Sequence, residues 1–156
     1  MLAAGDKAPE FALPDQNGDE VKLSDLRGET VVLYFYPRAD TPGCTTQACS
    51  VRDRRAEYKA AGARVLGASP DQVEAVQKFA GKYDLDFTLL ADADHAVAEA
   101  YGAWVEKSMY GKKYMGVQRC TFIIDPEGKI AKVFPKVSPK THDDLVLKAL
   151  AELTPA

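Results

Sequence analysis

Continuous apolar runs, rather than alternating ones, recur along the first two thirds of the chain. VVLYFY at 31–36 and RVLGA at 64–68 lack the polar alternation of half-exposed strands and therefore predict strands buried on both faces. FTLL at 87–90 predicts a third, shorter strand. Each run is followed by a segment that favours helix, so the pattern predicts strands joined by helices.

The helical segments carry recognisable start and stop signals. Residues 45–61 predict one helix that ends at Gly62, since glycine readily adopts the left-handed conformation found after helices. Ser-Pro-Asp at 69–71 predicts the next helix, with the serine as N-cap and the proline at the first helical position, ending near Gly81. Two further helices are expected, a short one over 96–101 and a last one over 142–153.

The last third of the chain breaks this alternation. TFII at 121–124 and IAKVF at 130–134 flank Asp-Pro-Glu-Gly, which predicts an antiparallel hairpin. Strands joined through helices pair in parallel, whereas hairpin strands pair antiparallel. The chain is therefore predicted to form an α/β fold with a mixed central sheet flanked by helices.

Residues 102–119 lie between these two parts and are rich in Gly and Lys, with several aromatic side chains. We expect a long loop here, and loops of this length often carry function. Three of its residues either border a site or serve packing: Trp104, Met109 and Tyr110.

Composition limits the class of protein. The 156 residues are 46% apolar and 28% charged, which predicts a single globular domain over 1–156. A net charge of −3 argues against nucleic acid or an anionic membrane as partner, and no apolar run approaches the roughly 18 residues of a membrane span. The basic residues Arg52, Arg54 and Arg55 are interpreted as a solvated helix face. The N-terminus lacks a secretory pattern, so we expect a cytoplasmic protein.

The stretch PRADTPGCTTQACS at 37–50 places a cysteine where a helix should begin. If Thr41 is the N-cap, Pro42 takes the first helical position and Cys44 the third. Free backbone N–H groups and the positive end of the helix dipole favour a thiolate there. Active sites in α/β sheets also gather at the carboxyl ends of strands. Cys44 is thus predicted to be a reactive thiol, the alternative being a small buried side chain.

Cys49 follows five residues later, and its spacing raises a geometric problem. In an intact helix the two Cα atoms lie about 8.6 Å apart, whereas a disulfide requires about 4.4–6.8 Å. A bond between them therefore requires the first helical turns to unwind. That segment consists mostly of weak helix formers, and strong formers come only after it. The alternative is that Cys49 is merely a small buried residue.

Metal binding is a weaker interpretation of these cysteines. Only Cys120 and two scattered histidines remain as further ligands, without the paired spacing of zinc sites. Asp92, Asp94 and His95 are interpreted as a turn and helix start rather than a metal site. No CxxC motif is present. We therefore expect no metal and no other cofactor.

The chain resembles peroxiredoxins of the bacterioferritin comigratory protein, or peroxiredoxin Q, subfamily. The resemblance rests on Pro37-x-x-x-Thr41-x-x-Cys44 within TPGCTTQAC, and on four further segments in family order. These are GDKAPEFALPDQNG, AGARVLGASPD, FTLLADADHAVAEAYGAW and TFIIDPEGKI, which together cover most of the chain. The resemblance implies a thioredoxin-like fold with an N-terminal β-hairpin extension.

The resemblance also implies a role for individual residues. Cys44 would be the peroxidatic cysteine and Cys49 the resolving cysteine. Thr41 would hydrogen-bond the peroxide and the thiolate, Pro37 would shield the site from water, and Arg119 matches the family's active-site arginine. Two positions depart from the common pattern. Gln47 stands where many peroxiredoxins carry Glu, and Cys120, where Ser or Thr is expected, is either a core residue or a third redox thiol.

The expected function is a thiol-dependent peroxidase acting on hydrogen peroxide and organic hydroperoxides. Cys44 would form a sulfenic acid, Cys49 would convert it to an intramolecular disulfide, and thioredoxin or a similar dithiol would reduce that bond. Family members of this type are often monomeric, so we expect a monomer. Two rival functions are a protein thiol–disulfide oxidoreductase, which the missing CxxC disfavours, and a redox sensor that oxidises a bound partner.

Overall fold

The computed structural model describes residues 1–153, and a five-stranded mixed sheet forms its centre. Its strands in spatial order are β5 (Thr88–Ala91), β4 (Ala63–Ser69), β3 (Thr30–Phe35), β8 (Cys120–Ile124) and β9 (Ile130–Phe134). The pairs β3–β4 and β4–β5 are parallel, whereas β8 runs antiparallel to both β3 and β9. The predicted mixed α/β fold with its late hairpin is confirmed.

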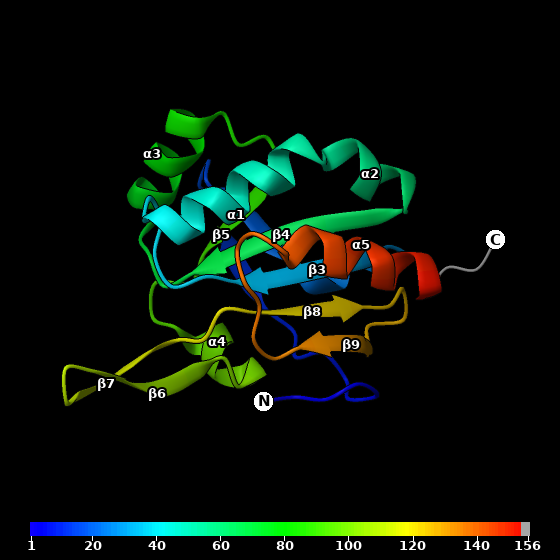
Figure 1. Ribbon diagram of the computed structural model, residues 1–156. Coiled ribbons are helices and arrows are strands. Elements are labelled where there is room, and N and C mark those ends of the chain that lie inside the picture. The colour runs from blue at the N-terminus through cyan, green and yellow to red at the C-terminus, as the bar shows by residue number, and fades with distance from the viewer. Residues whose placement is uncertain (154–156) are drawn as a thin grey trace.

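Helices cover both faces of this sheet. Figure 1 shows α1 (Pro42–Asp53), α2 (Arg55–Ala60) and α5 (His142–Leu153) on one side of it and α4 (Ala96–Tyr101) on the other. On β3, Val32 and Tyr34 belong to the core on the α1 side, whereas Leu33 and Phe35 belong to the core on the α4 side. The strand lacks polar alternation because both of its faces are buried. Among residues 1–153, no helix is long and apolar enough to cross a membrane.

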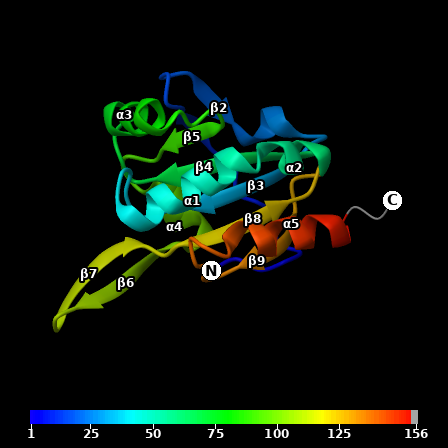
Figure 2. The same ribbon diagram turned by 45° about the horizontal axis from the view of Figure 1, so that its top comes forward.

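Two short hairpins lie outside the central sheet. The first pairs β1 (Ala12–Pro14) with β2 (Glu20–Lys22), as the resemblance implied for the N-terminus. The second pairs β6 (Trp104–Met109) with β7 (Lys112–Val117), and it projects away from the sheet in both ribbon views (Figures 1 and 2).

The β6–β7 hairpin corrects the predicted long loop over 102–119. Its turn consists of Tyr110 and Gly111, which both have positive φ angles, 52° and 78°. A two-residue turn of this kind matches the twist of antiparallel strands. The strands escape the sequence pattern because most of their side chains are exposed, so no buried face produces an apolar alternation.

Two predicted helix boundaries are also wrong. The single helix expected over 45–61 is split at Arg54, whose backbone leaves helical geometry at φ −106° and ψ 17°. The Arg54 side chain pairs there with Glu57 and with Asp144 of α5, so tertiary contacts override the local helix preference. Gly62 follows α2 with a positive φ of 71°, as predicted.

The third helix, α3 (Val73–Tyr83), starts later than predicted. Ser69 is not its N-cap, because β4 extends through this buried residue and pairs it with Ala91 of β5. Gly81 lies inside the helix rather than at its end. The helix ends at Asp84, which adopts the left-handed conformation at φ 52°.

Candidate active site

Cys44 lies at the junction between the central strand and the first helix. β3 ends at Phe35, and α1 begins at Pro42 with Thr41 in extended N-cap geometry, as predicted. The Thr45 N–H donates to the Thr41 carbonyl at 2.8 Å, which closes the first helical turn. Cys44 is therefore the third residue of α1, and its side chain is 1% exposed. The N–H groups of Gly43 and Cys44 belong to the first turn of the helix and have no partner within it.

Arg119 reaches the same thiol from a distant part of the chain. Its Nη2 lies 3.3 Å from the Cys44 sulfur, and its Nη1 donates to Gln47 Oε1 at 2.6 Å. Strand pairing explains the encounter, because β8 runs beside β3 with Cys120 opposite Phe35. Arg119, the residue just before β8, therefore lies next to the start of α1. A cation at this distance stabilises a thiolate over a neutral thiol.

Gln47 is the positioning contact that the sequence did not assign. It stands one helical turn after Cys44, on the same face of α1, and is completely buried. Its carbonyl oxygen holds the guanidinium of Arg119 without adding a negative charge. The i, i+3 spacing from Cys44 was the available signal, but its partner, Arg119, lies 72 residues away.

Gly43 leaves the space in which the guanidinium lies. A Cβ atom at this position would come 3.2 Å from Arg119 Nη2 and 3.4 Å from Pro139 Cγ. Its φ is not in the left-handed region that requires glycine. The absent side chain, rather than backbone freedom, is what this position contributes to the site.

Thr41 and Pro37 border the same corner of the molecule. Both are half-buried, and Pro37 lies in the segment between β3 and α1. The Thr41 hydroxyl donates to the carbonyl of Arg38 at 2.9 Å, and no side-chain hydrogen bond caps the helix. With its proton engaged, the hydroxyl oxygen is oriented as an acceptor.

A second cation lies within electrostatic range of the site. Lys107 of β6 is half-buried, and its stem packs over Gly116 on the paired strand β7. Burial, and then the positive charge of Arg119, lower the pKa of the Lys107 ammonium, whereas the charge of Cys44 opposes this shift. The β6–β7 hairpin, predicted as a loop, therefore adds positive charge to the surroundings of Cys44.

Comparisons with known proteins agree with this geometry. A model described as the AhpC/TSA family matches residues 4–133. The chain belongs to the AhpC/TSA family. It is 52% identical over 151 residues to Peroxiredoxin Bcp of Escherichia coli (strain K12), with 97% of each chain covered. It is 45% identical over 153 residues to Peroxiredoxin Bcp of Bacillus subtilis (strain 168), with 98% of each covered.

Solved structures give the same assignment. Peroxiredoxin Q of Xanthomonas campestris is 36% identical with a TM-score of 0.90, over 96% of this chain and 97% of that one. A structure titled for the alkyl peroxide reduction activity of Xanthomonas campestris bacterioferritin comigratory protein is 35% identical, also with a TM-score of 0.90, over 96% and 98%. The chain is thus a peroxiredoxin of this subfamily, with a thioredoxin-like fold and thiol-dependent peroxidase activity. Family membership implies peroxide substrates and a dithiol reductant.

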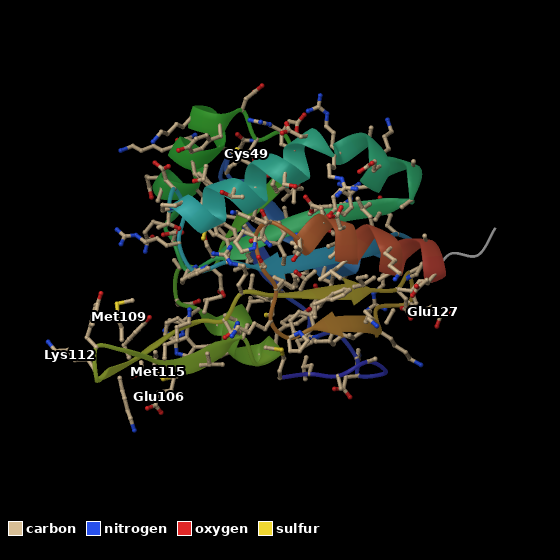
Figure 3. All side chains as sticks on the ribbon, viewed as in Figure 1. Cys49, Glu106, Met109, Lys112, Met115 and Glu127 are labelled. Atoms are coloured by element: carbon tan, nitrogen blue, oxygen red, sulfur yellow. The ribbon has the colours of Figure 1, made fainter. Side chains whose placement is uncertain are left out.

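The second cysteine of this peroxiredoxin remains apart from the first. Cys44 and Cys49 are both free thiols, and α1 is an unbroken helix between them. Cys49, labelled on α1 in Figure 3, is half-buried against the core on this side of the sheet. Helix geometry holds their Cα atoms about 8.6 Å apart, which is beyond disulfide range. The structure is therefore that of a reduced peroxiredoxin.

Cys120 occupies a different environment from the other two cysteines. It is 0% exposed and belongs to the apolar core on the α4 side of the sheet, whereas Cys44 belongs to the core on the α1 side. Burial raises the pKa of its thiol to about 12. Of the two interpretations of Cys120, the core residue is the one that this environment favours.

The remaining candidates have structural partners. Asp92 accepts hydrogen bonds from the Val97 and Ala98 N–H groups of α4, and the His95 ring stacks on Trp104 with centroids 3.8 Å apart. Met109 and Tyr110 lie exposed at the tip of the hairpin (Figure 3 labels Met109). The three arginines of the basic cluster pair with acids: Arg52 with Asp53, Arg54 with Glu57 and Asp144, and Arg55 with Asp86. Within residues 1–153, no group of His, Cys, Asp and Glu side chains could hold a metal ion.

Proposed function

We propose that this peroxiredoxin reduces hydrogen peroxide and organic hydroperoxides through a sulfenic acid on Cys44 and a disulfide between Cys44 and Cys49. The observation that carries the proposal is the contact of Arg119 with the buried Cys44 sulfur at the start of α1. Reduction of organic hydroperoxides is supported by the relative whose title names alkyl peroxide reduction.

In the first step the Cys44 thiolate attacks one peroxide oxygen. A sulfur–oxygen bond forms, the O–O bond breaks, and the departing oxygen leaves with the electron pair and takes a proton to become water or an alcohol. Negative charge moves from the sulfur onto that oxygen. The guanidinium of Arg119 and the free N–H groups at the start of α1 would stabilise it. The Thr41 oxygen would accept a hydrogen bond from a bound peroxide, and Pro37 would limit access of water.

In the second step Cys49 resolves the sulfenic acid. Its thiol attacks the Cys44 sulfur, a disulfide forms, and water leaves. The helix must unwind first, because intact α1 keeps the two cysteines apart. A dithiol such as thioredoxin would then reduce the disulfide by exchange, and α1 would refold. We further propose that the enzyme completes this cycle as a monomer.

Stopped-flow oxidation of the pre-reduced protein tests this proposal. Wild type should react with hydrogen peroxide far faster than free cysteine and should then form the disulfide. Cys44→Ser should be inert, and Cys49→Ser should oxidise at a similar rate but stop at the sulfenic acid. In wild type the tryptic peptide 39–52, which holds both cysteines, should become lighter by two hydrogen atoms.

Two results would contradict the proposal. A wild-type rate equal to that of free cysteine would remove the catalytic role of Cys44. A disulfide between protein molecules, with peptide 39–52 unchanged in mass, would remove the resolving role of Cys49 and favour a redox sensor that oxidises a partner.

A further inference from the structure

The two halves of α1 are attached to different parts of the molecule. In the first half, Cys44 and Gln47 both contact the guanidinium of Arg119. The Thr46 hydroxyl donates back to the Pro42 carbonyl inside the same helix, so it makes no tertiary attachment. The side-chain polar contacts of the first half therefore converge on Arg119.

The second half is held by neighbouring helices. The Ser50 hydroxyl donates to Asp143 of α5, and Arg54, at the end of α1, pairs with Asp144. Arg52 donates to the carbonyl of Tyr83 at the end of α3. These contacts do not involve Arg119 or Cys44. They can persist when the first half of the helix leaves its place.

Asp143 is the centre of this second set of contacts. It is 2% exposed, and both of its carboxylate oxygens are engaged: Oδ2 accepts from Ser50 and Oδ1 accepts from Tyr58 of α2. His142 Nδ1 also lies 3.2 Å from Oδ1, and His142 Nε2 lies 2.8 Å from the Thr121 hydroxyl of β8. One buried carboxylate thus joins α1 and α2 to α5, and through His142 to the central sheet.

The buried carboxylate is held firmly in its charged form. Burial opposes ionisation of Asp143, but the nearby His142 ring and the hydrogen bonds from Ser50 and Tyr58 outweigh it and lower the pKa of this group. A buried carboxylate that loses one of its donors is left with an unsatisfied charge, which is costly. Releasing Ser50 from Asp143 is therefore unfavourable, and the boundary between the two halves of α1 falls immediately after Cys49.

We propose that Asp143 is a positioning residue that clamps α1 at Ser50, so that the unwinding needed for the disulfide stops at Cys49. The inference rests on the disulfide proposed above. Its consequence concerns refolding, because starting a new helix costs much more than extending an existing one. A turn retained after Cys49 lets α1 reform by extension once the disulfide has been reduced.

Hydrogen–deuterium exchange of the reduced and the disulfide forms tests the clamp. In the wild-type disulfide form, amides up to residue 53 should exchange rapidly, because those of 50–53 lose their carbonyl partners at 46–49. The amides of Arg54, Glu57 and Tyr58, which donate to carbonyls at 50–54, should remain protected. In the disulfide form of Asp143→Asn, exchange over 54–58 should rise by about tenfold or more, as expected for a lost hydrogen bond to a buried charge. In the reduced variant the rise should be much smaller, because Arg119 still holds the first half.

Two further variants complete the experiment. Glu152→Gln, an exposed acid on the same helix, is the matched control and should leave the exchange pattern unchanged. Ser50→Ala removes the hydrogen bond through which Asp143 holds α1, so it should move the exchange boundary in the same direction, and it replaces Asp143→Asn if that variant does not fold.

Specific results would overturn the clamp. A wild-type disulfide form that loses protection throughout 42–60, or an Asp143→Asn boundary identical to wild type, contradicts it. An equal rise in both redox forms would make Asp143 a general stabilising residue instead. Peptide mapping separates these failures from that of the underlying mechanism: if peptide 39–52 does not lose two hydrogen atoms, the disulfide is wrong and the clamp falls with it.

Discussion

Two cysteines of this peroxiredoxin are equally buried and yet have opposite surroundings. Cys44 and Cys120 are 1% and 0% exposed, and they lie against opposite faces of the same sheet. Cys44 stands at a helix start with a guanidinium 3.3 Å from its sulfur. Cys120 stands at the start of a central strand among apolar side chains, where burial raises the pKa of its thiol to about 12.

The comparison separates burial from activation. Removing a thiol from water disfavours its charged form, so burial alone makes a cysteine inert. Reactivity at Cys44 requires compensation, which the helix start and Arg119 can supply in the same small volume. The two cysteines therefore allow a comparison within one protein of how such contacts affect a buried thiol.

The largest difference should appear when each cysteine is removed. Cys44→Ser should abolish peroxide turnover with a dithiol reductant, whereas Cys120→Ala should change it by no more than about twofold, because the Cys120 side chain lies in the core on the opposite face of the sheet from Cys44. Steady-state peroxide consumption measures both. A large loss of turnover in well-folded Cys120→Ala would show that Cys120 is a third redox thiol. The contrast between a reactive Cys44 and an inert Cys120 would then be wrong.

Removing the cation should move Cys44 toward the behaviour of Cys120. Arg119→Ala should slow oxidation of Cys44 by about 10²–10³-fold, the usual effect of losing one donor to a transition-state oxyanion. A buried thiol without a neighbouring cation also ionises less readily, so the pH dependence of the loss must separate thiolate formation from stabilisation of the departing oxygen.

Single-turnover stopped flow across pH measures the effect of Arg119→Ala. Arg64→Ala, which removes an exposed arginine on β4, is the control. A loss that disappears at high pH would assign Arg119 to thiolate formation only.

The smallest effect concerns stability and tests the inert cysteine. Because the pKa of Cys120 is raised from 9.0 to about 12 in the folded state, its thiol ionises first in the unfolded state as pH rises. The stability that it contributes is complete below about pH 9 and declines toward pH 12. The stability advantage of wild type over Cys120→Ala should therefore shrink by about 1 kcal/mol between pH 8 and pH 10.

Urea denaturation of both proteins at the two pH values measures this change. The other two cysteines are common to both proteins, so their ionisation cancels in the difference. A constant difference would show that the environment of Cys120 is more polar than its neighbours indicate.

Local signals were sufficient for much of the fold and for half of the site. The apolar run at 31–36 and the Thr-Pro-Gly-Cys sequence each depend on neighbours in the chain, and both the strand and the helix start are confirmed. The β6–β7 hairpin was missed because an exposed ribbon needs no apolar alternation. The late start of α3 was missed because pairing of Ser69 with β5 outweighs its capping preference.

Contacts between residues far apart in the chain could not be predicted from the spacing of residues in the sequence. Arg119 meets Cys44 because β8 pairs with β3 in a particular register, and no pattern around residue 119 encodes that register. Resemblance to a family suggested this arginine, and geometry supplied its contact. Asp143 had neither kind of signal, since Ser50 lies 93 residues away and the hydroxyl of Ser50 is an ordinary feature of a helix.

Gly43 determines how much space is left for the guanidinium of Arg119. A methyl group at this position would lie 3.2 Å from Arg119 Nη2, too close for the guanidinium to stay where it is. The guanidinium would have to shift by a few tenths of an ångström, which would disturb its contacts with Cys44 and Gln47. Position 43 therefore offers a way to alter the contact between the guanidinium and the Cys44 sulfur without replacing Arg119 or Cys44.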